Sequence, residues 1–202
     1  MSELPTEFFR RQDERPDKEF YRHPRLTSHL DAVASGKARA LYDTVLPVGG
    51  HVLDLMASFH SHLPNKFSSV TALGLNVEEL NSNLFVTDRI IFDLNLQTQL
   101  PFETALFDGA VCTVRIQYMI RPYETFSEVA RVLKPGAPFV VTFSNKMFPT
   151  KAVLAWRASD DAAHMRLVED YFVNVSGFAR VQKRYFLPVR GDPLYAIWAY
   201  KG

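Results

Sequence analysis

One buried strand and the loop after it constrain the fold of this chain most. Residues 51–55 read His-Val-Leu-Asp-Leu, a short apolar run with an acidic residue, Asp54, near its end. Such a run is typical of a buried parallel strand. In nucleotide-binding α/β units the next loop contains glycines, which let the backbone approach the ligand. Here no glycine occurs between Gly50 and Gly74, so the strand has the character of a cofactor-binding strand and the loop does not.

The remainder of the chain alternates predicted strands and helices. Strands are expected at about 51–55, 70–75, up to 93, 107–113, 139–143, 178–186 and 194–200. Helices are expected at about 24–46, after 76, from 122, and in one or two pieces over 150–167. This alternation predicts a parallel sheet covered by helices on both faces, closed by a hairpin-like strand pair.

Two helix boundaries carry specific expectations. Gly36 is expected to bend or split the first helix, in which Leu26, Leu30 and Val33 would share one apolar stripe. Asn76, followed three residues later by Glu79, fits a capping box at the start of the next helix.

Composition excludes several classes of function. The 202 residues carry a formal net charge of +1, which gives no argument for a nucleic-acid or anionic-membrane partner. No apolar run reaches the roughly 18–20 residues that cross a bilayer, and the charged N-terminus lacks the apolar core of a signal peptide. A lone cysteine, Cys112, excludes an internal disulfide. We expect a reducing, cytoplasmic setting, or an organelle stroma if a targeting segment has been removed; the oligomeric state stays open.

The chain divides into a mixed-charge arm, residues 1–22, and a single domain, residues 23–202. We expect the arm to be ordered only where its aromatic residues find a surface. Tyr21, Arg25 and His29 could fold over the mouth of a pocket, where Arg25 could hold a carboxylate. The favoured interpretation of these three residues is an ordinary helix start with solvated charges.

Several motifs follow one another in a recognisable order. They are Val52-Leu53-Asp54-Leu55, then Leu-Pro-Phe at 100–102, Phe-Asp at 107–108, and Phe-Ser-Glu-Val-Ala-Arg-Val-Leu-Lys-Pro-Gly at 126–136. Over residues 50–145 the chain resembles the class I S-adenosylmethionine-dependent methyltransferases, in particular their small-molecule type 11 branch, as a variant without the glycine-rich loop. The resemblance implies an α/β, Rossmann-like, seven-stranded and mostly parallel sheet with an antiparallel last strand. It also implies S-adenosylmethionine as the cofactor, bound across the carboxyl ends of the first strands.

The resemblance assigns roles around the first strand. Asp54 would accept hydrogen bonds from backbone N–H groups or from the ammonium of the cofactor, and the alternative is a carboxylate that only caps the turn. Met56, Ser58 and His60 stand at the three glycine positions of the family. The Ser58 hydroxyl could replace a lost backbone contact, or the loop could pack inward and partly fill the pocket; the two alternatives have equal weight.

Three further cofactor contacts are implied by the same resemblance. Asn76 would hold the ribose, although a plain helix cap is slightly favoured for it. Asp93 would accept a hydrogen bond from the adenine amine while the Leu94 N–H donates to a ring nitrogen. The alternative for this pair is an acidic turn after a strand.

The turn at Cys112, Thr113, Val114 and Arg115 would line the methionine portion of the cofactor, which makes Thr113 a candidate contact. Cys112 itself is expected to be a small buried hydrophobe. Tyr118 is the one candidate for a catalytic, substrate-facing residue.

Two other chemistries are disfavoured. His60 and His62, with His51 nearby, have no acidic partner at a useful spacing, so no metal site is expected. No G-x-S-x-G elbow accompanies Ser58 or Ser61, which disfavours a hydrolase. The leading hypothesis is methyl transfer to a small molecule. The alternative is a degenerate relative that binds a ligand or partner without methyl transfer, and a weaker third reading is a protein-binding module that uses the aromatic arm.

Overall fold

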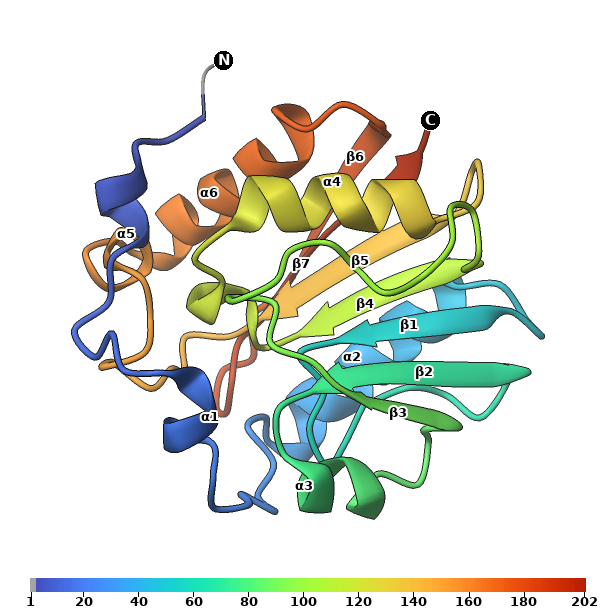
Figure 1. Cartoon of the computed structure of the whole chain (residues 1–202), viewed down its shortest axis with the longest axis horizontal. Helices are drawn as coiled ribbons and strands as arrows, with labels where there is room; N and C mark the ends of the chain where they lie inside the picture. The colour runs from blue at the N-terminus through green and yellow to red at the C-terminus, as the bar shows by residue number, and fades with distance from the viewer. Residues whose placement is uncertain (1–2) are drawn as a thin grey trace.

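Seven strands form one sheet in the order β3-β2-β1-β4-β5-β7-β6 in the computed structural model, which describes residues 3–202 (Figure 1). The bounds are β1 His51–Leu55, β2 Ser69–Gly74, β3 Asp88–Ile91, β4 Gly109–Thr113, β5 Pro138–Phe143, β6 Phe178–Phe186 and β7 Leu194–Lys201. The predicted strands are confirmed, and the third ends at Ile91 rather than Asp93.

The direction of the strands also follows the prediction. β1 pairs in parallel with β2 on one side and β4 on the other, and β4 pairs in parallel with β5. β7 runs antiparallel to both of its neighbours, β5 and β6. Strand order therefore reverses between β1 and β4, and α/β sheets bind ligands at the carboxyl edge beside such a switch point.

Helices cover both faces of the sheet. α2 (Ala32–Val45) and α3 (Val77–Ser82) lie on one face, while α4 (Pro122–Val132), α5 (Leu154–Arg157) and α6 (Asp161–Val173) lie on the other. The short turns η1 (Thr6–Phe9), α1 (Asp17–Phe20) and η2 (Ile116–Tyr118) complete the described elements.

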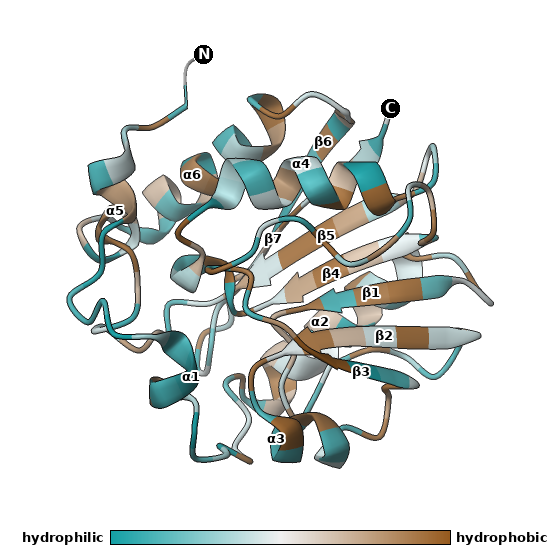
Figure 2. Cartoon of the chain, viewed as in Figure 1, coloured by the Kyte–Doolittle hydropathy of each residue, from teal (hydrophilic) through white to brown (hydrophobic). Residues whose placement is uncertain are grey.

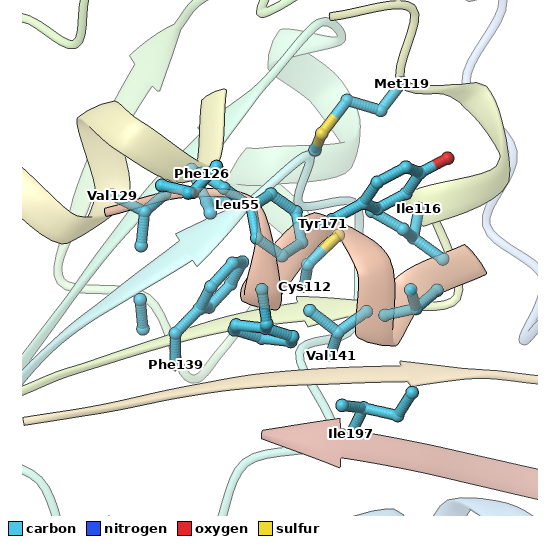
Figure 3. Packing of buried hydrophobic residues seen from close by; sticks show 14 of the residues in the cluster. Leu55, Cys112, Ile116, Met119, Phe126, Val129, Phe139, Val141, Tyr171 and Ile197 are labelled. Atoms are coloured by element: carbon cyan, nitrogen blue, oxygen red, sulfur yellow. The ribbon is translucent and has the colours of Figure 1, made fainter. Parts of the chain in front are cut away.

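The core is thickest under α4 and α6. Phe126 of α4 and Tyr171 of α6 are fully buried with Cys112 and Phe139 from the strands beneath them (Figure 3). Figure 2 colours the chain by hydropathy: the central strands are largely brown, which is hydrophobic, and the segment around α1 is largely teal, which is hydrophilic. Burying this apolar surface contributes most of the free energy of folding.

The connection from β1 to β2, residues 56–68, contains no helix. Its Leu63 is fully buried in the α2-side core together with Val52 and Val70. Ala57 and Phe67 of the same loop also pack against this core, so the loop covers part of the sheet without a helix.

The first predicted helix requires a correction. The helix begins at Ala32, because Asp31 caps it by accepting a hydrogen bond from the Ala34 N–H at 2.8 Å, and residues 24–31 are irregular. Leu26 and Val33 are exposed, so the predicted apolar stripe is wrong at both positions. The helix also passes Gly36 without a break, since one exposed glycine costs only about 1 kcal/mol.

The motif at residues 126–136 forms contacts that stabilise the fold. Glu128 and Arg131 form an ion pair of 2.7 Å on α4. Glu128 also accepts from the Leu100 N–H, and Arg131 donates to the carbonyl oxygens of Leu100 and Phe102. The motif therefore fastens the Leu-Pro-Phe segment to the helix.

The arm lies against the carboxyl edge of the sheet, toward which the parallel strands point (Figure 1). Phe9 is buried in the main core, and backbone bonds join Asp13 to Thr150 and Leu154 to Arg10. Met1 and Ser2, the first residues of the predicted arm, lie outside the described residues. None of the helices in residues 3–202 is long and apolar enough to cross a membrane.

Candidate functional site

The carboxyl ends of four adjacent strands meet at a narrow cavity. Its volume is about 40 Å³. The lining comes from the ends of β1 to β4, from α3 and from the arm: Tyr21, Met56, Ala57, Ser58, Gly74, Leu75, Asn76, Glu79, Phe92, Asp93, Leu94 and Arg115. Of the residues predicted to bind the cofactor, Met56, Ser58, Asn76, Asp93 and Leu94 meet here. Asp54 and Thr113 line a second, smaller hollow directly beside it.

Asp54 is a buried carboxyl group that lacks a full set of partners. It is 2% exposed, and its Oδ2 has no hydrogen-bond partner. Burial raises its pKa to about 7, partly offset by the Ser61 hydroxyl and the Arg115 guanidinium. An unpaired buried oxygen of this kind is costly, and it is available to a cationic ligand group. Its predicted role stays a prediction.

The loop after β1 takes a glycine-like conformation without a glycine. Met56 has φ +53, in the left-handed region that costs a side-chain-bearing residue about 1–2 kcal/mol. The loop then lies directly on β2, because a Cβ built on Gly74 would stand 2.5 Å from the Ala57 carbonyl oxygen. The loop therefore approaches β2 closely, and the side chains of Met56, Ser58 and His60 line the cavities at this edge.

Ser58 and His60, at the other two glycine positions, fill space. The Ser58 hydroxyl donates to Glu79 Oε2 at 2.5 Å, and both groups are buried. The His60 ring packs edge-on against His62 with ring centres 4.3 Å apart. These contacts favour the alternative in which the loop packs inward and partly fills the pocket.

Asn76 caps α3, as predicted. Its Oδ1 accepts from the N–H groups of Glu78 and Glu79, and its Nδ2 donates to the carbonyl oxygens of Tyr21 (2.8 Å) and Arg22 (3.2 Å). The reciprocal half of the capping box is not formed, because the Glu79 carboxylate binds Ser58 and the Arg25 N–H instead. The amide of Asn76 is thus committed to the helix and the arm, and a ribose contact would have to displace the arm.

Asp93 and Leu94 follow β3 and line the cavity. Asp93 Oδ1 accepts from the Asn95 N–H at 2.9 Å, which forms the acidic turn foreseen as the alternative. Burial raises the pKa of Asp93. Both residues line the cavity, and their adenine contacts stay a prediction.

Cys112 and Thr113 end β4. Cys112 is fully buried, and burial raises the pKa of its thiol to about 12, which confirms the prediction of a small buried hydrophobe. The Thr113 hydroxyl is hydrogen-bonded to Tyr42 Oη at 2.6 Å. Tyr42 Oη also bonds to Thr142, so α2 fixes the ends of β4 and β5.

Tyr118 lines a much larger cavity of about 480 Å³ beside the first. It is 3% exposed, its hydroxyl accepts from the Phe148 N–H at 2.8 Å, and its ring stacks on Phe148 with centroids 5.9 Å apart. Burial raises its pKa. This environment suits a wall residue better than a proton acceptor, and the catalytic assignment stays a prediction.

Arg115 stands where the cavities meet, and it lines all three of them. The preceding Val114 has φ +50, which is a rare conformation for a β-branched residue. Strain of this kind collects at functional sites. Burial lowers the pKa of His29 to about 4 and that of His62 to about 3, so both neighbouring imidazoles are neutral at neutral pH.

The arm closes the small cavity from outside. Tyr21 lines it, and His29 lines the two neighbouring cavities. The Arg25 guanidinium lies 4.4 Å from the Phe20 ring centre and 5.2 Å from that of Phe148. Arg25 therefore packs among aromatic rings as a cation–π contact instead of being a solvated charge. Its Nη2 donates to the Phe20 carbonyl oxygen, and its buried Nη1 has no partner, so its predicted carboxylate contact stays a prediction.

Sequence reasoning missed two contributors to the site. Glu79 was assigned only to a helix cap, yet its carboxylate binds the β1 loop. The tie between Asn76 and the arm was also not foreseen, because a side chain that bonds to a backbone carbonyl 54 residues away leaves no local pattern.

The volume of the first cavity limits what it can hold as it stands. Ligand pockets usually measure about 300–1,000 Å³, far more than the 40 Å³ found here. The polar groups present, with the partnerless Asp54 Oδ2 in the adjoining hollow and Asp93 and Leu94 in the lining, suit the implied nucleoside cofactor in kind. A nucleoside would therefore need more space than this lining, which includes Tyr21 and Met56, leaves open.

The sequence of the chain is similar to those of known proteins over part of its length. Residues 55–141 match a family described as a methyltransferase domain. Over 82 residues the chain is 33% identical to the biotin biosynthesis bifunctional protein BioHC of Teredinibacter turnerae. That match covers 41% of this chain but only 14% of the length of the relative.

Solved structures share the fold over most of the chain. A SAM-dependent methyltransferase from Aquifex aeolicus matches 92% of this chain and 97% of its own, with a TM-score of 0.57 and 16% identity. An N-methyltransferase from Haemonchus contortus, solved with phosphomonomethylethanolamine and S-adenosylhomocysteine, matches 82% of this chain and 52% of its own. Its TM-score is 0.56 at 13% identity. At these identities the likeness is one of fold.

Proposed function

This chain is a class I methyltransferase-like protein, and we propose that it transfers a methyl group from S-adenosylmethionine to a small molecule. The observation that carries the proposal is the unpaired Asp54 carboxyl oxygen at the carboxyl end of β1. A fold needs no such costly group there for its own stability. A cationic ligand group at the switch point would supply the partner that this buried Asp54 oxygen lacks.

The chain's own residues divide the work of holding the cofactor. Asp54 would accept from the ammonium group, and Asp93 with the Leu94 N–H would hold the adenine edge. Ser58, Asn76 and Thr113 are already engaged with other protein groups, so their part is to hold the loop, helix and strand ends in place. Met56 would lie against the nucleoside.

The acceptor would bind in the 480 Å³ cavity beside Arg115. S-adenosylmethionine supplies a methyl carbon that is already electrophilic, so the protein has mainly to align the acceptor and exclude water. Neutral His29 and a raised Tyr118 pKa provide no strong base, which favours an acceptor that arrives without a proton on its nucleophilic atom.

The second candidate, a degenerate relative that binds another ligand, is favoured by one observation. The cavity at the cofactor position measures about 40 Å³, and the arm covers it. A fold of this kind can persist while its activity changes.

Isothermal titration with S-adenosylhomocysteine separates the two candidates. The methyltransferase proposal expects saturable binding and a thermal shift that grows with ligand concentration. No heat and no shift at millimolar ligand would leave only the degenerate relative. Incubation with methyl-labelled cofactor and a small-molecule library then identifies acceptors.

A Met56→Gly variant sharpens this test. The change removes the side chain that lines both small cavities and relieves a positive φ of +53. We expect tighter binding of S-adenosylhomocysteine, by about tenfold, because the removed side chain leaves space in the cavity. Stability should not fall, because glycine adopts this positive φ without strain. Weaker binding would mean that the methionine side chain contacts the cofactor. Leu96→Gly, at an exposed site outside the cavities, is the matched control.

A further inference from the structure

The larger cavity carries an unusual distribution of charge. Its charged lining residues are Arg115 and Lys146, with His29 beside them, and no aspartate or glutamate lines it. Arg115 is 8% exposed. Lys146 lies at the mouth, where it pairs with Asp192 at 2.7 Å.

Arg115 is a buried cation without a counter-ion among residues 3–202. Its guanidinium makes one hydrogen bond, from Nη1 to the Val114 carbonyl oxygen at 3.3 Å, and no ion pair. Elsewhere the chain pairs its buried cations: Lys151 lies 3.1 Å from Asp17, which also binds Arg11 at 2.7 Å. Asp54 is a neighbouring carboxyl group on which Arg115 acts, but the two form no ion pair, and burial raises the pKa of Asp54 to about 7. A buried cation with so little compensation is expensive, so an anion from outside the chain would stabilise it.

The turn that carries Arg115 is held in place. The Val114 carbonyl accepts from both Arg115 Nη1 and Gln117 Nε2, the latter at 3.1 Å. Gln117 also lines the cavity, and its buried Oε1 has no partner. The wall beside them is aromatic, formed by Phe148 and the Tyr118 ring stacked on it.

We propose that the 480 Å³ cavity binds its small-molecule ligand, the methyl acceptor under the proposed function on which this rests, as an oxyanion paired with Arg115. A guanidinium binds carboxylate and phosphate groups through two parallel hydrogen bonds. The expected ligand therefore carries one of these oxyanions, next to a flat apolar group that packs on the aromatic wall. Gln117 Oε1 would accept from a donor group on the same ligand. The cation-lined cavity disfavours a positively charged acceptor.

Titration of the full chain with four probes tests the proposal: benzoate, phenyl phosphate, benzyl alcohol and benzylamine. We expect at least one of the two anions to bind, and the neutral and cationic probes to bind at least about tenfold more weakly. The stronger anion identifies the acceptor as a carboxylate or a phosphate. Equal binding of benzyl alcohol, or no binding of either anion, would overturn the proposal.

Variants assign the effect to Arg115. Arg115→Met should weaken the anion by at least about tenfold, Arg115→Lys should weaken it less because the charge is kept, and exposed Arg190→Met should not change it. S-adenosylhomocysteine affinity should be unchanged in Arg190→Met. In Arg115→Met it should fall less than the anion affinity does, because Arg115 lines the cofactor cavity but is not among the groups proposed to hold the cofactor. If Arg115→Met instead lost S-adenosylhomocysteine and kept the anion, the guanidinium would serve the cofactor, and the proposal would be wrong. Should Arg115→Met not fold, Arg115→Lys decides between the same outcomes.

The two proposals can fail separately. Anion binding is measured without cofactor, so a wild-type chain that binds benzoate through Arg115 but not S-adenosylhomocysteine would remove the methyl transfer and keep the oxyanion site.

Discussion

Asp54 shows how one residue can favour ligand binding at the expense of stability. Burial raises the pKa of its carboxyl group from 3.8 to about 7. The unfolded chain therefore loses this proton about three pH units before the folded chain does. Between those values stability falls as pH rises, which is the reverse of the trend for a paired aspartate.

Replacing Asp54 by Asn should remove that trend. The isosteric amide has no charge to bury, so we expect Asp54→Asn to be more stable than wild type at pH 8, by up to on the order of 4 kcal/mol, and nearly equal at pH 4. The measurement is urea unfolding of both proteins from pH 4 to 8. His29 and His62 have lowered pKa values and contribute equally to both, so they cancel in the difference. A difference that does not vary with pH would show that the carboxyl titrates normally.

Among the elements, the loop at 56–68 departs most from a standard α/β crossover. It lies close on β2 without a helix, and Gly74 is the position that permits the approach: an added Cβ would meet the Ala57 carbonyl oxygen at 2.5 Å and Leu80 Cδ2 at 3.0 Å. The position of the loop therefore depends on β2 having no side chain there.

Two glycine-to-alanine substitutions should have opposite effects. Gly74→Ala forces the loop off β2, and we expect a loss of about 1–3 kcal/mol. Gly36→Ala adds a Cβ that meets nothing within 4 Å on α2, and we expect a gain of about 0.5–1 kcal/mol. Urea unfolding measures both changes. A Gly74→Ala protein as stable as wild type would contradict the close contact between loop and strand.

At the scale of the whole molecule, a buried ion cluster joins the arm to the sheet edge. The Lys151 cluster consists of Lys151, Asp17, Arg11 and Asp13, with Lys151 fully buried and 3.1 Å from Asp17. Asn95 adds a hydrogen bond of 2.7 Å to Asp17 from the loop after β3. We propose that arm and domain unfold as one unit, because breaking this cluster would leave charges buried without partners.

Lys151→Met should therefore destabilise the whole chain. We expect a loss of about 3 kcal/mol, a single unfolding transition, and faster tryptic cleavage at Lys18 and Arg22 in the loosened arm. Lys134→Met, which removes an exposed ion pair with Asp108, is the matched control and should change stability by less than about 1 kcal/mol. Faster cleavage without any loss of stability would show that the arm detaches independently of the domain.

The sequence predicted what depends on short-range patterns. Strand alternation, the Asn76 helix cap, the buried Cys112 and the order of the motifs all follow from residues close together in the chain. The predicted start of the first helix was wrong because the apolar spacing of Leu26 and Val33 looked periodic although neither residue is buried. A capping aspartate, Asp31, decided the true start.

Only the tertiary structure decided which partners the polar side chains of the site have. The sequence determined that Asp54 ends a buried strand and that no glycine follows it. It did not determine that two carbonyl oxygens of the arm would accept hydrogen bonds from Asn76, or that the Glu79 carboxylate would accept one from the Ser58 hydroxyl. Nor did it determine that Arg115 would be buried without a counter-ion. Local propensity fixes the conformation of neighbouring residues, whereas partners for buried polar groups come from whichever segments the completed fold brings together.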